Sequence, residues 1–226
     1  IMNYYERFLK LKQFTDSVGP IYGTEDFGIY FYSVIKMMKP KSILELGTGL
    51  GTTMLWAAQA LDENNRGKIH TIDDGSEWDH LKKARDQMGE YFREDYLFYI
   101  ENLIDSFNVR NFVEFHPVKI EEIKSDNPID ILFSDFAHGP GNVLQLLAEF
   151  LPQMNSYSKI YIDSASTHYG SYHTLEKVIN MLNQNTIPLS ILERSTNEKI
   201  HQVIHTSQFQ LDHIVENKDR SQNSTA

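Results

Sequence analysis

The sequence predicts an α/β fold with a mostly parallel sheet, and three observations carry this prediction. Short β-rich runs alternate with longer helical stretches, which is the pattern of successive βαβ units. A glycine-rich loop, residues 47–51, follows the first β-rich run. Four runs end in or next to an acidic residue, namely Glu45, Asp73, Asp135 and Asp163. Because ligands bind at the carboxyl ends of the strands in open α/β sheets, these acids predict a site there.

The composition is that of an ordinary globular protein and excludes several kinds of site. Of the 226 residues, 41% are apolar and 23% are charged, and no run reaches the ~18 apolar residues that span a membrane. Residues 1–12 mix aromatic and charged side chains, unlike a signal peptide. Cysteine is absent, which excludes disulfides, thiolate metal sites and cysteine nucleophiles. The net charge of −10 disfavours nucleic acid and anionic lipid, so we expect a cytoplasmic protein that binds neither.

The first part of the chain predicts two strands with their flanking helices. Residues 25–38 form an apolar helical stretch before the first β-rich run, at 42–46. The glycine loop then leads into a helix at about 52–61. Asn64-Asn65-Arg66-Gly67 is a turn sequence, and it leads into a second strand at 68–72.

The connection after the second strand, residues 76–108, is longer than the roughly dozen residues that a crossover needs. It predicts two helices, at about 78–91 and 96–107. Its aromatic side chains could line a substrate cap or the interface of a homodimer, and core packing is the alternative for them. These residues are Trp78, Tyr91, Phe92, Tyr96 and Tyr99.

The remaining chain continues the alternation and then changes character. Three more strands are predicted at 112–115, 129–133 and 159–162, and two helices at 142–154 and 172–183. The last part, 189–215, holds β-like runs that could close the sheet with an antiparallel strand, at 190–192, 202–204 and 209–215. Residues 216–226 are polar and predict a disordered tail. A single domain over 1–215, with N-terminal helices in 1–38, accounts for the rest.

The glycine loop is the most specific motif of the sequence. In Glu45-Leu46-Gly47-Thr48-Gly49-Leu50-Gly51 the third glycine comes one residue earlier than in the dinucleotide fingerprint. An acid also stands two residues before the first glycine. That carboxylate would repel a pyrophosphate but would attract a cationic amino-acid ligand. A tight strand–helix turn without a ligand is the alternative interpretation.

This arrangement resembles motif I of the class I S-adenosylmethionine (SAM)-dependent methyltransferases. The resemblance covers residues 25–192 and implies a Rossmann-like, doubly wound sheet of seven mostly parallel strands with an antiparallel C-terminal strand. It places Glu45 near the methionine end of SAM and Asp73 at the ribose hydroxyls, with Asp74 as the alternative. The loop residues that it assigns to the cofactor are Gly47, Thr48, Gly49 and Gly51. The acidic adenine contact of the family has no counterpart, because residues 116–119 read His-Pro-Val-Lys.

A second cluster resembles a subgroup of small-molecule O-methyltransferases. Members of that subgroup have Asp-x-x-His after the fourth strand, here Asp135 and His138, and two adjacent acids after the fifth. In metal-dependent members the first Asp and the two later acids bind a divalent ion. Here Ser164 follows Asp163 in place of the second acid. A hard cation prefers several oxygen ligands, so we predict no metal and assign Asp135 to the cofactor site.

Methyl transfer to a protonated acceptor needs a base as well as a positioned nucleophile. His138 is the first candidate, since a neutral imidazole is available near pH 7; capping of the following helix is its alternative role. His168, in the loop after the fifth strand, is the second candidate, and Asp163 is the third. We interpret the histidines near the C-terminus as structural residues of terminal strands; they are His201, His205 and His213.

The sequence therefore predicts a SAM-dependent methyltransferase that acts on an oxygen or nitrogen of a small polar or aromatic molecule. One alternative is a nicotinamide-dependent oxidoreductase, against which the early third glycine and Glu45 argue. Another is a non-catalytic cofactor-binding protein of the same fold. Nucleic-acid methylation is disfavoured, because residues 134–137 stand where an Asn/Asp-Pro-Pro-aromatic element would be.

Overall fold

The chain has an α/β Rossmann-like fold, and the sheet has five parallel strands in the part of the chain that the structure describes. The structure is a computed structural model, and it describes residues 3–19, 25–81, 89–123, 128–136, 138–164, 169–195, 199–215 and 224–225. The chain divides into two compact units, the first made mainly of residues up to 124 and the second mainly of residues 125–215. The predicted domain bounds and disordered tail stay predictions.

The first unit holds three strands and most of the predicted helices. Its α-helices are α1 (Tyr4–Val18), α2 (Glu25–Met38), α3 (Thr52–Asn64), α4 (Trp78–Leu81) and α6 (Tyr96–Ser106). Its strands are β1 (Ser42–Leu46), β2 (Lys68–Ile72) and β3 (Val113–His116). Short 3₁₀ turns complete it at η2 (Gly89–Tyr91), η3 (Arg110–Phe112) and η4 (Ile120–Glu122). The predicted bounds of α2, β1 and β2 are confirmed to the residue.

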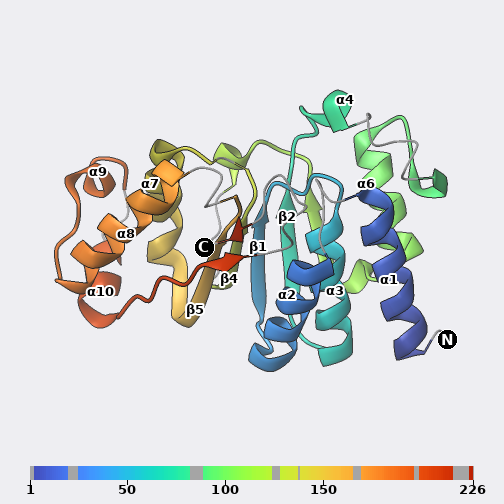
Figure 1. Cartoon of the computed structure of the whole chain (residues 1–226), viewed down its shortest axis with the longest axis horizontal. Helices are drawn as coiled ribbons and strands as arrows, with labels where there is room; N and C mark the ends of the chain where they lie inside the picture. Colours follow the sequence, from blue (N-terminus) through green and yellow to red (C-terminus); the bar gives the residue numbers. More distant parts are fainter. Residues whose placement is uncertain are drawn as a thin grey trace. The chain divides into compact units, whose positions relative to one another are not determined.

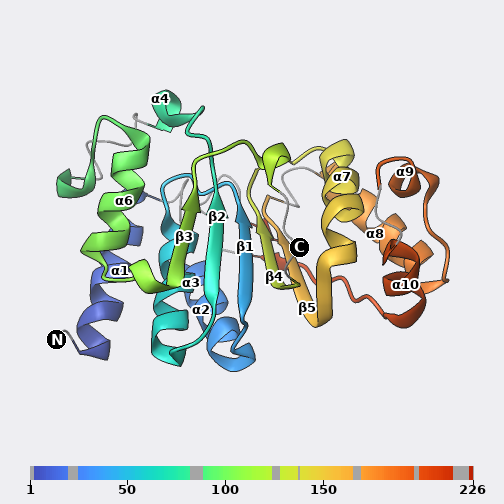
Figure 2. The same cartoon turned by 180° about the vertical axis from the view of Figure 1, so that it is seen from behind.

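The strands of the first unit pair in parallel in the order β3-β2-β1, with β3 at the edge. Helices α2 and α3 lie in front of these strands in Figure 1 and behind them in Figure 2, so both cover the same face. The two helices pack closely at Gly28, where a Cβ atom would lie 2.3 Å from the indole nitrogen of Trp56. Trp56 is fully buried, so only glycine fits at that contact.

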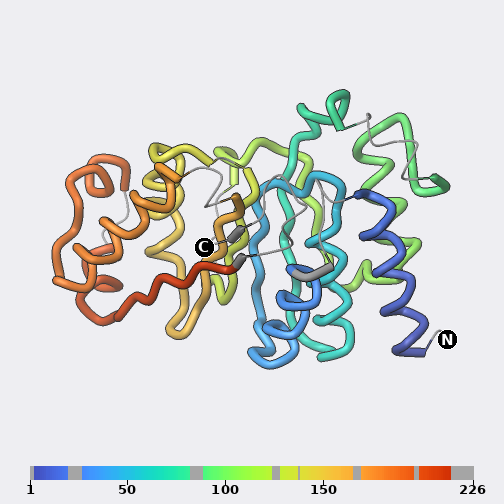
Figure 3. Tube along the Cα trace, viewed as in Figure 1, coloured from blue at the N-terminus to red at the C-terminus, as the bar shows by residue number. Residues whose placement is uncertain are grey.

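The second unit holds the two remaining parallel strands, β4 (Ile129–Ser134) and β5 (Met154–Ile162), which pair with each other. Its helices are α7 (Pro140–Phe150), η5 (Leu151–Gln153), α8 (Tyr169–Asn183), α9 (Leu189–Leu192) and α10 (Lys199–Thr206). Pro140 opens α7 at a first-turn position, where its missing N–H costs no hydrogen bond. The trace in Figure 3 follows this unit from yellow-green to red.

The seven-stranded sheet with an antiparallel C-terminal strand is corrected, because the parallel sheet has five strands in the described part of the chain. The runs at 190–192 and 202–204 lie in α9 and α10. In α10, Ile200 and Ile204 are buried while His201 and His205 are exposed, which is a helical spacing. His201 and His205 therefore stand on a helix and not on a strand, and His213 lies just before β6. Two-residue strands β6 (Ile214–Val215) and β7 (Ser224–Thr225) pair antiparallel as a separate sheet.

None of the described helices combines the length and the apolar character that a membrane crossing requires. The predicted cytoplasmic location stays a prediction.

Candidate functional site

The loop between β1 and α3 turns sharply, and its three glycines adopt conformations that other residues rarely take. Their φ angles are 91° at Gly47, 52° at Gly49 and 80° at Gly51, all in the left-handed region that glycine enters without steric cost. The N–H of Gly47 donates to the carbonyl of Ile72, which joins the loop to the end of β2. The loop is therefore anchored at the end of β2, directly before Asp73.

Gly49 is a residue of this loop that has free space next to its backbone. A Cβ atom placed there would meet no heavy atom within 4 Å. Its N–H donates to Asp73 Oδ2 over 2.9 Å, so the backbone is fixed while the space next to it stays free. A close approach of a ligand to the backbone is what such a position permits.

Asp73 receives hydrogen bonds from the backbone on both carboxylate oxygens. Oδ2 accepts the N–H of Gly49, and Oδ1 accepts that of Gly75 over 2.8 Å. Each oxygen has a second acceptor position for a ligand hydroxyl. The neighbouring Asp74 is exposed and accepts hydrogen bonds from the side chain and the N–H of Ser76, which hold the pKa of Asp74 below its usual range. The geometry thus favours Asp73 over Asp74 for a role at the loop.

Two tyrosines that sequence reasoning placed in a cap, an interface or the core hold the glycine loop in position. The hydroxyl of Tyr96 donates to the carbonyl of Gly49, and that of Tyr99 donates to the carbonyl of Leu50, both over 3.0 Å. Burial raises the pKa of both hydroxyls, and for Tyr96 the charge of Asp73 raises it further. They stay protonated donors. Both rings are buried and pack around Trp78, so core packing and loop support coincide.

Glu45 is a buried carboxyl next to this loop. Its side chain accepts a hydrogen bond from the hydroxyl of Thr71 through Oε2, and Thr71 also contacts the hydroxyl of Thr48 at 2.5 Å. The other oxygen, Oε1, is buried without a hydrogen-bond partner in the described part of the chain. Burial raises the pKa of Glu45 to about 8; the bond from Thr71 opposes the rise, and the charge of Asp73 adds to it. A buried carboxyl with an unsatisfied oxygen is suited to a cationic group.

The second predicted cluster lies at the carboxyl ends of β4 and β5, in the second unit. His138 Nε2 lies 3.8 Å from Asp135 Oδ1, so the structure brings these two residues together. Asp135 is more exposed than His138, at 41% against 21% for the side chains. The hydroxyl of Ser171, on α8, donates to the carbonyl of His138 and ties its backbone to that helix.

Asp163 and Ser164 form a buried pair at the end of β5. The hydroxyl of Ser164 donates to Asp163 Oδ2 over 2.8 Å, and the N–H of Asp163 donates to the carbonyl of Ser134. Ser164 has a φ of 58°, a left-handed conformation that non-glycine residues seldom adopt. His168, the second candidate base, lies outside the described residues.

This combination of fold and loop defines a class of protein. An α/β Rossmann-like fold with an acid and three alternating glycines after β1, and a second acid after β2, is that of a class I SAM-dependent methyltransferase. The model of a methyltransferase domain family matches residues 44–165, more than half of the chain. The chain belongs to this methyltransferase family. The predicted enzyme class, SAM-dependent methyltransferase, is confirmed.

Solved structures share the fold at low sequence identity. The O-methyltransferase TomG from Streptomyces achromogenes, solved in complex with SAM, is 14% identical over 100% of this chain and 89% of its own, with a TM-score of 0.54. An O-methyltransferase from Bacillus cereus, solved with S-adenosylhomocysteine (SAH), is 14% identical over 97% and 88%, with a TM-score of 0.51. A comparison with curated proteins gives no match.

Proposed function

We propose that this protein transfers the methyl group of SAM to an oxygen or nitrogen of a small polar or aromatic molecule. The observation that carries the proposal is the hydrogen-bonded network around the glycine loop. In it, Asp73 holds Gly49 and Thr71 joins Glu45 to Thr48. A network of this kind, in a chain of the methyltransferase family, supports cofactor binding by the first unit.

The residues present fit SAM at three points. The carboxylate of Asp73 has acceptor capacity left for ribose hydroxyls. The free space at Gly49 admits a ligand against the backbone. The buried Oε1 of Glu45 offers a partner to a cationic amino-acid group. When bound, SAM supplies a methyl group on a positively charged sulfur, which is the electrophile of the reaction.

The second unit supplies the candidate base. His138 would take the proton of the attacking O–H or N–H group, since a neutral imidazole is the acceptor that pH 7 provides. The nearby Asp135 would stabilise the imidazolium that forms, because an opposite charge at 3.8 Å favours the charged ring. Asp163 and His168 are the alternatives for proton removal.

Oxygen acceptors are the first to test, since two proteins that share the fold are O-methyltransferases by name. Catechols and phenols have an acidic O–H that a histidine can remove in the transition state. Small amines form the second group of acceptors. A homodimer remains the expected assembly.

Cofactor choice separates this proposal from the alternatives. A thermal-shift panel of SAM, SAH, NAD and NADP should raise the melting temperature with the first two only, since a ligand that binds the folded state stabilises it by mass action. Single-turnover assays with methyl-labelled SAM and the acceptor panel then test transfer. Stabilisation by NAD or NADP alone would contradict the methyltransferase assignment. Binding of SAM without transfer to any acceptor class would support the non-catalytic alternative.

A further inference from the structure

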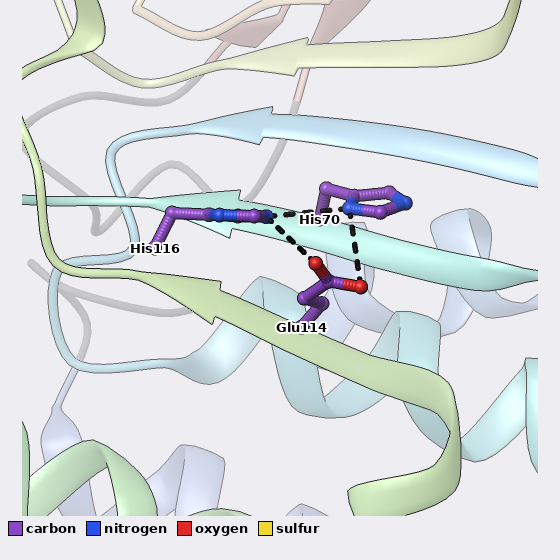
Figure 4. A group of neighbouring side chains, drawn as sticks. All are labelled: His70, Glu114 and His116. Atoms are coloured by element: carbon purple, nitrogen blue, oxygen red, sulfur yellow. Dashed lines mark hydrogen bonds and ion pairs between the residues drawn. The ribbon is translucent and has the colours of Figure 1, made fainter. Parts of the chain in front are cut away.

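Three metal-ligating side chains meet on one face of the first unit, on the strands β2 and β3. His70 lies in the middle of β2, and its register partner on β3 is Glu114. His116 follows two residues later and therefore points to the same face as Glu114. Figure 4 shows the two imidazole rings and the carboxylate converging. Neither the glycine-loop network nor the Asp135–His138 pair uses any of these side chains.

The distances within this trio are those of a site that is close to assembled. His70 Nδ1 lies 3.3 Å from His116 Nε2, and the Glu114 oxygens lie 3.8 Å and 3.7 Å from these two nitrogens. One ligand atom from each residue fits within 4.8 Å of the other two. Ligands at ~2.0–2.1 Å from a tetrahedral zinc are about 3.3–3.5 Å apart. Small side-chain rotations would therefore suffice to bind an ion.

The surroundings suit an ion with one open coordination position. The side chains of His70, Glu114 and His116 are 31%, 46% and 28% exposed, so water can complete the coordination. Burial lowers the pKa of His70, although the charge of Glu114 opposes this. Burial alone would raise the pKa of Glu114, but Lys68 and the two histidines outweigh burial and lower it. Lys68 Nζ lies 3.3 Å from Glu114 and opposes a cation there.

We propose that His70, Glu114 and His116 bind a divalent transition-metal ion, with zinc as the ion that this donor set favours. Two imidazoles, one carboxylate and an open fourth position are a donor set that zinc uses in proteins. Magnesium and calcium prefer all-oxygen surroundings and do not suit two imidazoles. The site is independent of methyl transfer, and its test does not require the acceptor. A bound ion would join the edge strand β3 to β2.

The test is a titration of the full chain with zinc chloride after chelation, followed by calorimetry. His201 and His205 need separate treatment, because they are exposed and one helical turn apart on α10 and could chelate zinc themselves. The reference protein therefore carries His201→Asn and His205→Asn. We expect it to bind one equivalent of zinc and to melt at a higher temperature when zinc is bound.

Three variants in this background remove one ligand each. Glu114→Gln keeps the shape of the side chain. His70→Gln leaves no metal-ligating atom at the position of Nδ1, and His116→Asn leaves none at the position of Nε2. Removing a residue that only supports a metal ligand weakens metal binding by about 10–100-fold. Removing a ligand itself should therefore lower the affinity for zinc at least about tenfold in each variant. Cobalt(II) absorption in the visible range should show a tetrahedral site that each variant loses.

Glu114→Gln carries the most weight, because its side chain is the most exposed of the three and its loss should disturb the fold least. Circular dichroism of each variant without metal establishes that it is folded. A reference protein that fails to bind an equivalent of zinc would overturn the proposal. So would a folded Glu114→Gln variant with the affinity of the reference protein, since the trio would then be only a hydrogen-bonded and ionic cluster.

Discussion

The glycine-loop network in the first unit and the strand-end cluster in the second differ in their exposure and in the contacts that define them. Asp73 receives two backbone N–H groups, and the carbonyls of the loop receive two buried tyrosine hydroxyls. Asp135 and His138 face each other at 3.8 Å, and Asp135 is well exposed. Backbone hydrogen bonds fix a binding surface before the ligand arrives, which reduces the ordering cost of binding.

This difference assigns separate tasks to the two regions. A preorganised loop is suited to a constant ligand, the cofactor, whose shape does not vary between reactions. The Asp135–His138 pair, with its exposed carboxylate, is suited to act on the acceptor and its proton. Substitutions in the first unit should therefore change cofactor affinity, and substitutions in the second should change the rate of transfer.

The largest expected effect is that of His138→Gln. General-base catalysis contributes roughly 10²–10⁴-fold, so the single-turnover rate with saturating SAM should fall by about this factor. Calorimetry with SAH should give the affinity of the parent protein. His173→Gln is the matched control, because His173 is an exposed histidine of α8 and should change neither quantity.

Two results would contradict this separation of affinity and rate. If His138→Gln weakens SAH binding as much as it slows transfer, the second unit does not act on rate alone. If His168→Gln causes the larger loss of rate, the base lies in the loop after β5. An unchanged rate in both variants would remove histidine from proton transfer and leave Asp163 or an acceptor that is already deprotonated.

The next effect concerns cofactor affinity. Asp73→Ala should weaken SAH binding by about 1–3 kcal/mol, the cost of leaving hydroxyl groups unpaired, which is about 5–150-fold. Asp74→Ala is the control and should bind SAH as the parent does, since Asp74 is exposed and bonded to its own turn. Calorimetry at one pH measures both. An Asp73→Ala variant with the SAH affinity of the parent would contradict the assignment of Asp73 to the ribose. If only Asp74→Ala lost SAH affinity, the ribose contact would be assigned to Asp74.

Much of the first unit could be predicted because its patterns are local. The apolar run before Gly47 and the turn ending at Gly67 fix the ends of β1, α3 and β2. The functional roles of Tyr96 and Tyr99 could not be predicted, because their hydroxyls reach the loop carbonyls from more than forty residues away in sequence. Their partners follow from tertiary packing, for which the sequence carries no local signal.

Other features depended on choices that a single sequence leaves open. The run around Ile200 and Ile204 has a composition that suits a strand. Its helical conformation is recognised only once both residues are seen to be buried on the same side of α10. Glu114 and His116 stand two apart on β3 and so share a face, but the strand predicted at 112–115 ended before His116. Their meeting with His70 required the register of β2 and β3, which the sequence does not specify.

A smaller effect concerns the ionisation of Glu45. Its pKa is about 8 in the folded chain against 4.5 ordinarily. Between these values the folded state retains a proton that the unfolded state releases, so the free energy of unfolding falls as pH rises. The contribution is fully present below pH 4.5 and is lost as pH rises through 8. One proton corresponds to at most about 1.4 kcal/mol per pH unit.

Urea unfolding at pH 6 and 7 of the parent and of Glu45→Gln measures this contribution. The fall with pH should be smaller in the variant, because a glutamine does not ionise. Glu176→Gln, whose side chain on α8 is 45% exposed, should keep the slope of the parent. Parallel slopes for the parent and Glu45→Gln would mean that Glu45 is not held protonated by burial.

The smallest expected effect is that of chelation on methyl transfer. Ser164 stands where a second acid would be, and its hydroxyl occupies one oxygen of the buried Asp163. A hard cation there would lack a carboxylate and would compete with this donor. We therefore expect EDTA to leave the single-turnover rate unchanged, while the melting temperature falls if zinc leaves the His70 site.

The readouts separate the two metal questions. Loss of turnover in EDTA with recovery by magnesium would contradict metal independence and make Asp135 and Asp163 ligands, completed by water or by acceptor oxygens. Recovery by zinc in the parent but not in His70→Gln would instead connect the strand site to the reaction. An unchanged rate together with a lower melting temperature would keep the tasks apart, because the ion would then stabilise the first unit without entering the chemistry. The metal would then serve the preorganised first unit and not the transfer step.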